Sequence, residues 1–252
     1  MPRRSWLAKT KSIHDLGGHF YVPNSSRPWN DRRESLAERK WLAHFDKPLP
    51  VAEADRPYFG SRLHDSHVLG TERGDHLRLR LDSINAGDFA WSLAAVLCVP
   101  RAEAVYPVDL VLHDAAYVRA AREEIGGGLG YVDWERLGMG ADETGVEFLY
   151  DWFFEQEGRL QWIAHLWVQH THRTSRPNDV YLMVDCAKAT ADDRCPEAFA
   201  KRFGAPAAQL YRDAVLRIDD RPIDFNVFDS SETENYIRRR MQAHGFTRED
   251  FS

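Results

Sequence analysis

The chain has 252 residues, with 33 Lys or Arg against 39 Asp or Glu, so its formal net charge is −6. Hydrophobic residues make up 43% and charged residues 29%, an ordinary balance for a globular protein. This composition excludes a disordered chain, a collagen-like chain and a broadly basic nucleic-acid coat. A chain of this length buries roughly three quarters of its unfolded surface, so it needs neither disulfides nor a metal to fold.

The first 60 residues differ from the rest. Residues 1–45 hold nine Lys or Arg and four acids, a net charge of +5, which leaves −11 for the remainder. Glycines and prolines divide this segment into loops, and one helix is predicted at about 34–45. We predict a basic N-terminal arm over 1–60, which either contacts an acidic partner or packs as a strap on the acidic body of its own chain. No apolar core follows the basic start, so no secretory signal is expected.

The strand patterns in residues 61–190 predict a β-rich core domain. Leu77–Leu81 alternates strictly between Leu and Arg, which is typical of a half-buried strand, and Gly74-Asp75 precedes it as a turn. We therefore expect a hairpin from about Leu63 to Asp82. The apolar runs at 93–99, 108–112 and 180–186 are interpreted as further strands. The longest apolar run, 89–99, is too short for a membrane span, which needs about 20 residues.

The clearest predicted hairpin covers 146–172. A two-residue turn at Glu157-Gly158 fixes its register, with Tyr150 opposite His165, Trp152 opposite Ile163 and Phe148 opposite Trp167. Both faces of this hairpin are apolar, so we expect it at the centre of a sheet covered on both sides.

The helix and capping patterns in residues 191–252 predict a helical C-terminal segment. Short helices are expected at 196–203 and 206–216, and Ser231-Glu-Thr-Glu234 has the pattern of a capping box for a helix that runs to about His244. The predicted fold class is α+β: a largely antiparallel sheet of five to eight strands, built on a central 146–172 hairpin, with N- and C-terminal helices packed on it.

Several short motifs resemble an uncharacterised bacterial domain family of unknown function. The motifs are Leu63-His-Asp-Ser-His-Val-Leu69, the strand at 77–82, Phe148-Leu-Tyr-Asp-Trp152, Trp162-Ile-Ala-His-Leu-Trp167 and the closing strand at 180–185. Phe148 and Asp151 stand where that family usually has Trp and Glu, and the match covers about residues 65–190. The resemblance implies a small, β-rich, bacterial, intracellular domain without an established activity. By analogy, similar small domains include immunity proteins that neutralise toxins by tight binding.

Two candidate sites come from histidines near carboxylates. Asp65 and His67 would share one face of an extended strand, with His64 on the other, and could act as metal ligands or as an acid–base pair. The alternative is that Asp65 accepts backbone hydrogen bonds at the start of the hairpin. His170 and His172 would share a face about 6–7 Å apart, so they could hold a divalent metal if Asp185 joined from a neighbouring strand. The alternative there is a polar strand end.

A third constellation is Tyr150, Asp151 and His165 on the predicted central hairpin. Tyr150 opposite His165 predicts a buried hydrogen-bonding pair, while Asp151, a candidate general base, lies on the opposite face. The chain has no phosphate-binding loop, no nucleophile elbow and no zinc-protease motif. Its three cysteines, an odd number without a C-x-x-C pair, argue against a disulfide framework and favour a reducing cytoplasm.

These observations leave three hypotheses open. The first is a non-enzymatic cytoplasmic binding protein, immunity-like or regulatory, with a protein partner and with no cofactor, membrane or nucleic-acid partner. The second is a metal-dependent hydrolase that uses His170, His172 and Asp185, with a metal-bound water as the nucleophile. The third is an assembly subunit whose basic arm docks on a neighbour. The sequence predicts no oligomeric state.

Overall fold

The computed structural model describes residues 49–60, 63–124, 128–137, 143–171, 178–216 and 230–251. Nearly all of the predicted N-terminal arm, including the helix expected at 34–45, lies outside these residues. His172 lies outside them as well.

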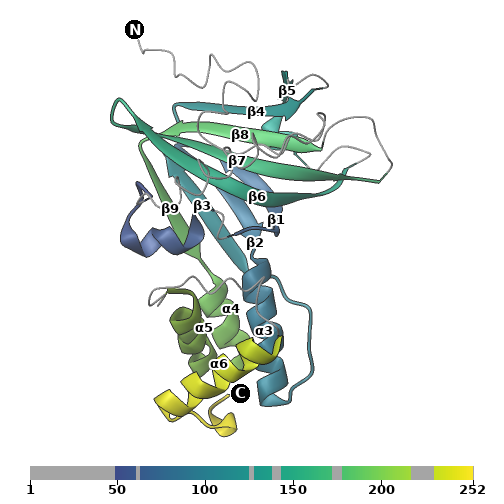
Figure 1. Ribbon diagram of the computed structural model, residues 1–252, viewed down its shortest axis with the longest axis vertical. Coiled ribbons are helices and arrows are strands. Elements are labelled where there is room, and N and C mark those ends of the chain that lie inside the picture. Colours follow the sequence, from purple (N-terminus) through teal and green to yellow (C-terminus); the bar gives the residue numbers. More distant parts are fainter. Residues whose placement is uncertain are drawn as a thin grey trace, which may run out of the picture.

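The protein has an α+β fold built on one antiparallel sheet of nine strands (Figure 1). The order across the sheet is β5-β4-β8-β7-β6-β1-β2-β3-β9, and every neighbouring pair is antiparallel. The sheet therefore has more strands than the five to eight predicted. The strands are β1 Ser66–Arg73, β2 His76–Asp82, β3 Pro107–His113, β4 Tyr117–Glu123, β5 Leu129–Val132, β6 Glu143–Gln156, β7 Arg159–His170, β8 Asp179–Cys186 and β9 Lys188–Asp193.

Strands β6 and β7 form the longest hairpin. Gln156 lies opposite Arg159, Trp152 opposite Ile163 and Tyr150 opposite His165. Beyond Tyr150 the register shifts by one residue at a bulge, so Phe148 lies opposite Leu166 and not opposite Trp167, as the sequence predicted. A bulge adds one residue to one strand. No sequence pattern in β6 predicts its position, so the register predicted beyond it is wrong.

The prediction of a strand at 93–99 is wrong. This segment belongs to helix α3, Ile84–Leu97. Ser83 caps the helix, because its hydroxyl accepts a hydrogen bond from the Ala86 amide at 3.3 Å, and Cys98 ends it in a left-handed conformation with φ 57°. A continuous apolar run does not distinguish a strand from a buried helix by periodicity, and here the run is helical.

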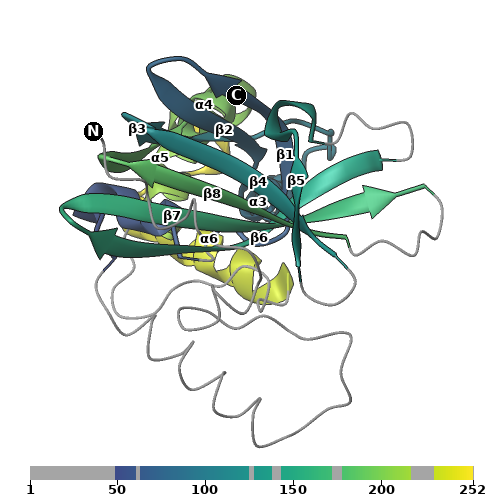
Figure 2. The same cartoon turned by 90° about the horizontal axis from the view of Figure 1, so that it is seen from above.

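The other helices are α4 Cys195–Phe203, α5 Ala205–Leu216 and α6 Ser230–His244, with short 3-10 helices η2 Glu53–Tyr58, η3 Trp134–Arg136 and η4 Arg248–Asp250. Helix α6 begins one residue before the predicted cap Ser231. A capping box is present at Thr247 and Asp250 of η4. Helices α3 to α6 gather at one end of the sheet (Figures 1 and 2). Helix α3 follows β2 directly and α4 follows β9, and these two strands end at the same side.

The two faces of the sheet have different environments. The inner face contributes to the main hydrophobic core, which the helices share. The alternate residues of β2 show the division, because Leu77, Leu79 and Leu81 are fully buried whereas Arg78 and Arg80 point to the outer face. A second, smaller cluster lies on the outer face of β4, β8, β7 and β6, and its buried members are Ala121, Trp152, Ile163, Tyr181 and Met183.

Candidate functional site

The outer face brings together five of the candidate residues, which the sequence analysis had assigned to two separate constellations. Paired residues of neighbouring strands share a face, so Tyr150, His165 and Tyr181 form one row across β6, β7 and β8. His67, Glu147, Trp167 and Asp179 form the adjacent row across β1, β6, β7 and β8. We call the group of His64, Asp65, Glu147, Tyr150, His165, Trp167 and Asp179 the histidine–aromatic face.

His64 and Asp65 enter this face from the turn before β1. The sequence predicted an extended strand here, with Asp65 and His67 on a shared face. Instead, β1 begins at Ser66 and Asp65 has a left-handed backbone with φ 63°. The carboxylate of Asp65 therefore meets His64, with Nδ1 and Oδ1 2.7 Å apart. Both side chains reach solvent, with 28% of His64 and 43% of Asp65 exposed.

Tyr150 links the two histidines of the site. Its ring lies 4.7 Å from the ring of His64 and 6.2 Å from that of His165, measured between centroids. Burial and the nearby charge of Asp65 raise the pKa of the Tyr150 hydroxyl, so this group stays protonated at neutral pH. Tyr150 is half-buried and offers an aromatic ring at the surface.

His165 is buried, at 3% exposure, and is held by two residues of β8. Its ring stacks on Tyr181, with centroids 4.9 Å apart and planes 14° apart. Its Nε2 lies 2.6 Å from an oxygen of Asp179, and 31% of that carboxylate side chain is exposed. His165 and Asp179 thus form a second histidine–carboxylate pair on the far side of Tyr150.

The three carboxylates of the histidine–aromatic face have partners other than lysine and arginine among the described residues. Asp65 and Asp179 pair with histidines, and Glu147 accepts a hydrogen bond from the Gln169 amide. Among the described residues, none of these three carboxylates forms an ion pair with Lys or Arg. A histidine carries charge only when it is protonated, so among the described residues these carboxylates have no permanently charged partner.

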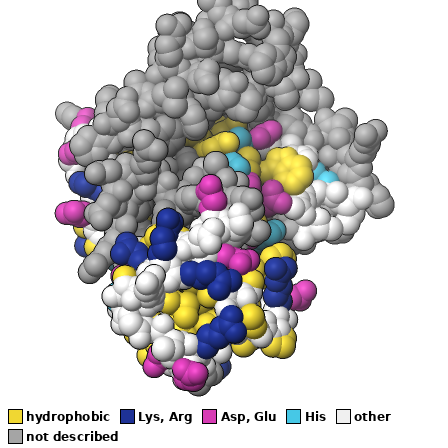
Figure 3. Space-filling model, turned by 60° about the horizontal axis from the view of Figure 1, so that its bottom comes forward, with side chains coloured by type: hydrophobic (Ala, Val, Ile, Leu, Met, Phe, Trp, Pro, Cys, Tyr) yellow, Lys and Arg dark blue, Asp and Glu magenta, His cyan; other side chains and the backbone are white. Residues whose placement is uncertain are grey.

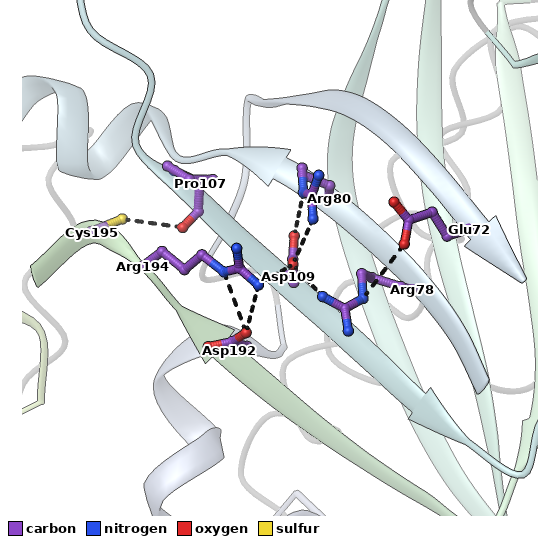
Figure 4. Close-up of polar contacts among 8 residues, drawn as sticks. All are labelled: Glu72, Arg78, Arg80, Pro107, Asp109, Asp192, Arg194 and Cys195. Carbon is purple, nitrogen blue, oxygen red and sulfur yellow. Dashed lines mark hydrogen bonds and ion pairs between the residues drawn. The ribbon is translucent and has the colours of Figure 1, made fainter. Parts of the chain in front are cut away.

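The other half of the outer face, over β2, β3 and β9, is organised differently (Figure 4). Asp109 of β3 is fully buried, and its carboxylate accepts hydrogen bonds from Arg78 at 2.8 Å and from Arg80 at 2.8 and 3.1 Å. Arg194 approaches the same carboxylate at 3.7 Å and bonds Asp192. We call these five residues, with Glu72 beside Arg78, the arginine network.

The electrostatics of the arginine network favour a charged Asp109. Burial acts to raise the pKa of this carboxyl, but the hydrogen bonds and charges of Arg80 and Arg78 outweigh burial and hold the pKa below its ordinary value. Three arginines face three carboxylates in this network, so its charges cancel within the chain.

The structure separates the residues of the predicted metal site. In the β7–β8 register Asp185 lies opposite Gln161, at the start of β7, whereas His170 is the last residue of that strand. Nine residues of strand place them about 30 Å apart. The expected pairing of the two strands does occur, but its antiparallel register brings Asp179, not Asp185, toward the His170 end.

Asp185 and His170 lie in different environments. Arg159 and Gln161 donate hydrogen bonds to the Asp185 carboxylate, the latter at 2.8 Å, and Arg159 also bonds Asp114. The two ring nitrogens of His170 are shielded from solvent, and no residue in the described ranges hydrogen-bonds them. Within those ranges no group of three His, Cys, Asp or Glu side chains is placed to hold a metal.

Asp151 lies on the inner face, apart from the histidine–aromatic face. It is buried, at 1% exposure, and accepts a hydrogen bond from the Trp162 indole at 2.9 Å. This contact satisfies the N–H of a buried Trp, so it gives Asp151 a structural role. His67 is exposed on β1 opposite Glu147, in the row that also holds Trp167 and Asp179.

Sequence reasoning missed Asp179, Glu147 and Trp167 as members of the site. The signal for Asp179 was present, because pairing 180–186 antiparallel to 160–167 from the strand ends places Asp179 beside His165. Glu147 and Trp167 required the bulge in β6, which sets them opposite each other.

No family model, no curated protein and no solved structure matches this chain. In the part of the chain that the structure describes, no helix is long and apolar enough to cross a membrane.

Proposed function

We propose that this protein is a non-enzymatic binding protein, of an immunity-like or regulatory kind, that holds a protein partner against the histidine–aromatic face. The observation that carries the proposal is the composition of this face. Half-buried Tyr150 and Trp167 lie beside carboxylates that no described Lys or Arg neutralises. Aromatic side chains with a polar rim are typical of protein interfaces.

The same geometry gives little support to catalysis. A histidine–carboxylate pair activates a nucleophile that hydrogen-bonds the histidine. In the described ranges neither His64 nor His165 hydrogen-bonds a serine, threonine or cysteine. Burial raises the pKa of the Cys186 thiol to about 12 and that of Cys195 well above its ordinary value, so neither is a thiolate at neutral pH. The separation of His170 from Asp185 gives the hydrolase hypothesis no support within the described residues, and His172 lies outside them.

A pull-down from the native host tests this proposal. We expect the wild-type protein to retain one protein in stoichiometric amount, and Tyr150→Ala to lose it because the half-buried ring is removed. Asp192→Asn, on the other half of the outer face, is the matched control and should retain the partner. Thermal melting of each variant establishes that it is folded. Recovery of no partner at low and moderate salt, or equal recovery by Tyr150→Ala, would contradict the proposal.

Other sequence-based expectations stay predictions. These are the relationship to the bacterial domain family, the cytoplasmic location, the absence of a cofactor, and the packing of an N-terminal helix on the sheet. Docking of the basic arm on a neighbouring subunit also stays a prediction, and deletion of residues 1–30 with light scattering would test it.

A further inference from the structure

We propose that the partner segment bound by the histidine–aromatic face is cationic, with arginine side chains placed on the ring of Tyr150 and paired with Asp65 and Asp179. This inference rests on the proposed function and adds the chemistry of the partner. It depends on the charge of the face, on its rings, and on the contrast with the arginine network.

The charge of the face is the first argument. Asp65 and Asp179 lie on either side of Tyr150, each joined to a histidine whose ring contacts the tyrosine ring. Their side chains are 43% and 31% exposed, so they are accessible to a partner yet partly desolvated. A partner guanidinium can form bidentate hydrogen bonds with such a carboxylate.

The rings are the second argument. An arginine side chain over an aromatic face gains a cation–π attraction, and Arg stacks on a flat ring better than Lys does. The protein itself uses this contact elsewhere, with Arg101 5.3 Å from the Trp91 ring and Arg202 4.5 Å from the Phe203 ring. Tyr150 and Trp167 supply comparable rings beside the carboxylates.

The distribution of basic residues is the third argument. On the outer face, Arg78 and Arg80 of β2 are engaged with Asp109, and Arg194, which follows β9, is engaged with Asp192. In the view of Figure 3, histidine side chains lie beside hydrophobic and acidic ones near the sheet, whereas many Lys and Arg side chains gather over the helical end below. Charge complementarity of this kind speeds association and selects against acidic partners.

Fluorescence anisotropy of a labelled oligoarginine peptide tests the inference with the full chain. We expect saturable binding at moderate salt, stronger than that of oligolysine of equal length, and none of oligoglutamate. Asp65→Asn combined with Asp179→Asn should weaken binding about tenfold, since two charge pairs are lost. Glu72→Gln combined with Asp192→Asn removes the same number of charges from the arginine network and should change binding less than about twofold.

Three outcomes would overturn the inference. Equal weakening by the two double variants would show a response to net charge alone, and absence of oligoarginine binding would exclude a cationic site. Self-association that only the Asp65 and Asp179 substitutions abolish would make the occupant a second copy of the chain. The proposed function and this inference can fail separately. If a host partner requires Tyr150 but is not displaced by oligoarginine, the binding role stands and the inference of a cationic partner is wrong.

Discussion

The two halves of the outer face hold carboxylates in opposite ways. In the arginine network, buried Asp109 is surrounded by Arg78, Arg80 and Arg194, which are always charged. In the histidine–aromatic face, Asp65 and Asp179 meet histidines, which carry charge only when they are protonated. The ion pairs of the arginine network connect three strands of the sheet. The carboxylates of the histidine–aromatic face remain available to a partner.

The sequence of β2 explains the first arrangement. Its alternation places Arg78 and Arg80 next to each other on the outer face, and the β2–β3 register puts Asp109 directly opposite Arg80. Asp192 of β9 is the cross-strand neighbour of Asp109 on the other side. The network therefore links three strands through side chains, in addition to their backbone hydrogen bonds.

The largest expected effect comes from breaking the arginine network. We expect Asp109→Ala to lower the free energy of unfolding by about 2 to 3 kcal/mol, because two arginines lose a buried partner while staying partly hydrated. Asp192→Ala, whose side chain is 53% exposed, should cost less than about 0.5 kcal/mol. Urea denaturation at pH 7 measures both. Equal losses for the two variants would show that the network does not stabilise the sheet.

Acid should remove the same stabilisation. The pKa of Asp109 is lower in the folded protein than its ordinary value. Its contribution is therefore complete above the ordinary pKa of aspartate, about 4, and is lost as the pH falls through the lower, folded-state pKa. The difference in unfolding free energy between wild type and Asp109→Asn should shrink below pH 4. A difference that stays constant down to pH 2 would contradict the assignment.

Changes in the histidine–aromatic face should cost less. His165→Phe keeps a ring against Tyr181 but removes the bond to Asp179, so we expect a loss of about 1 kcal/mol. Asp65→Asn, at an exposed pair, should lose less than about 0.5 kcal/mol. Chemical denaturation at pH 7.5 checks both values. A loss for Asp65→Asn as large as that for Asp109→Ala would remove the distinction between the two halves.

A small stabilising effect is expected in the β6–β7 turn, outside both halves. Glu157 has φ 52° and Gly158 φ 76°, a pair of left-handed residues that favours Asn-Gly. Glu157→Asn should therefore stabilise the protein by about 0.5 kcal/mol, measured as a rise in Tm, without changing oligoarginine binding. A fall in Tm would indicate that the Glu157 side chain outweighs the backbone preference.

Local patterns predicted the strands that alternate or end at clear turns. The Leu-Arg alternation of 77–81 and the Gly74-Asp75 turn gave the β1–β2 hairpin, which the structure confirms. The same reasoning failed at α3, where a fully apolar run of 93–97 has no period to detect and only the Ser83 cap distinguishes it. Isolated charge positions did not reveal that Asp109 is a buried residue, since that depends on which strands become neighbours.

The site was predicted only in pieces for a similar reason. Tyr150 and His165 were paired through a turn two residues long, which local sequence fixes. His64 and Asp65 joined them because of one left-handed residue at Asp65, a conformation that an aspartate adopts without any marker in the sequence. Asp179 joined through the pairing of β8 with β7, which the strand ends indicate but which the sequence analysis did not extend to this residue.

The edge strand β9 limits how copies of the protein can associate through the sheet. The Ala191 amide, on the edge strand β9, donates a hydrogen bond at 2.9 Å to the Asp55 carboxylate of η2. A neighbouring molecule that tried to extend the sheet there would have to displace this side chain and face its negative charge. The Asp55 contact therefore disfavours the addition of another strand at this point of β9.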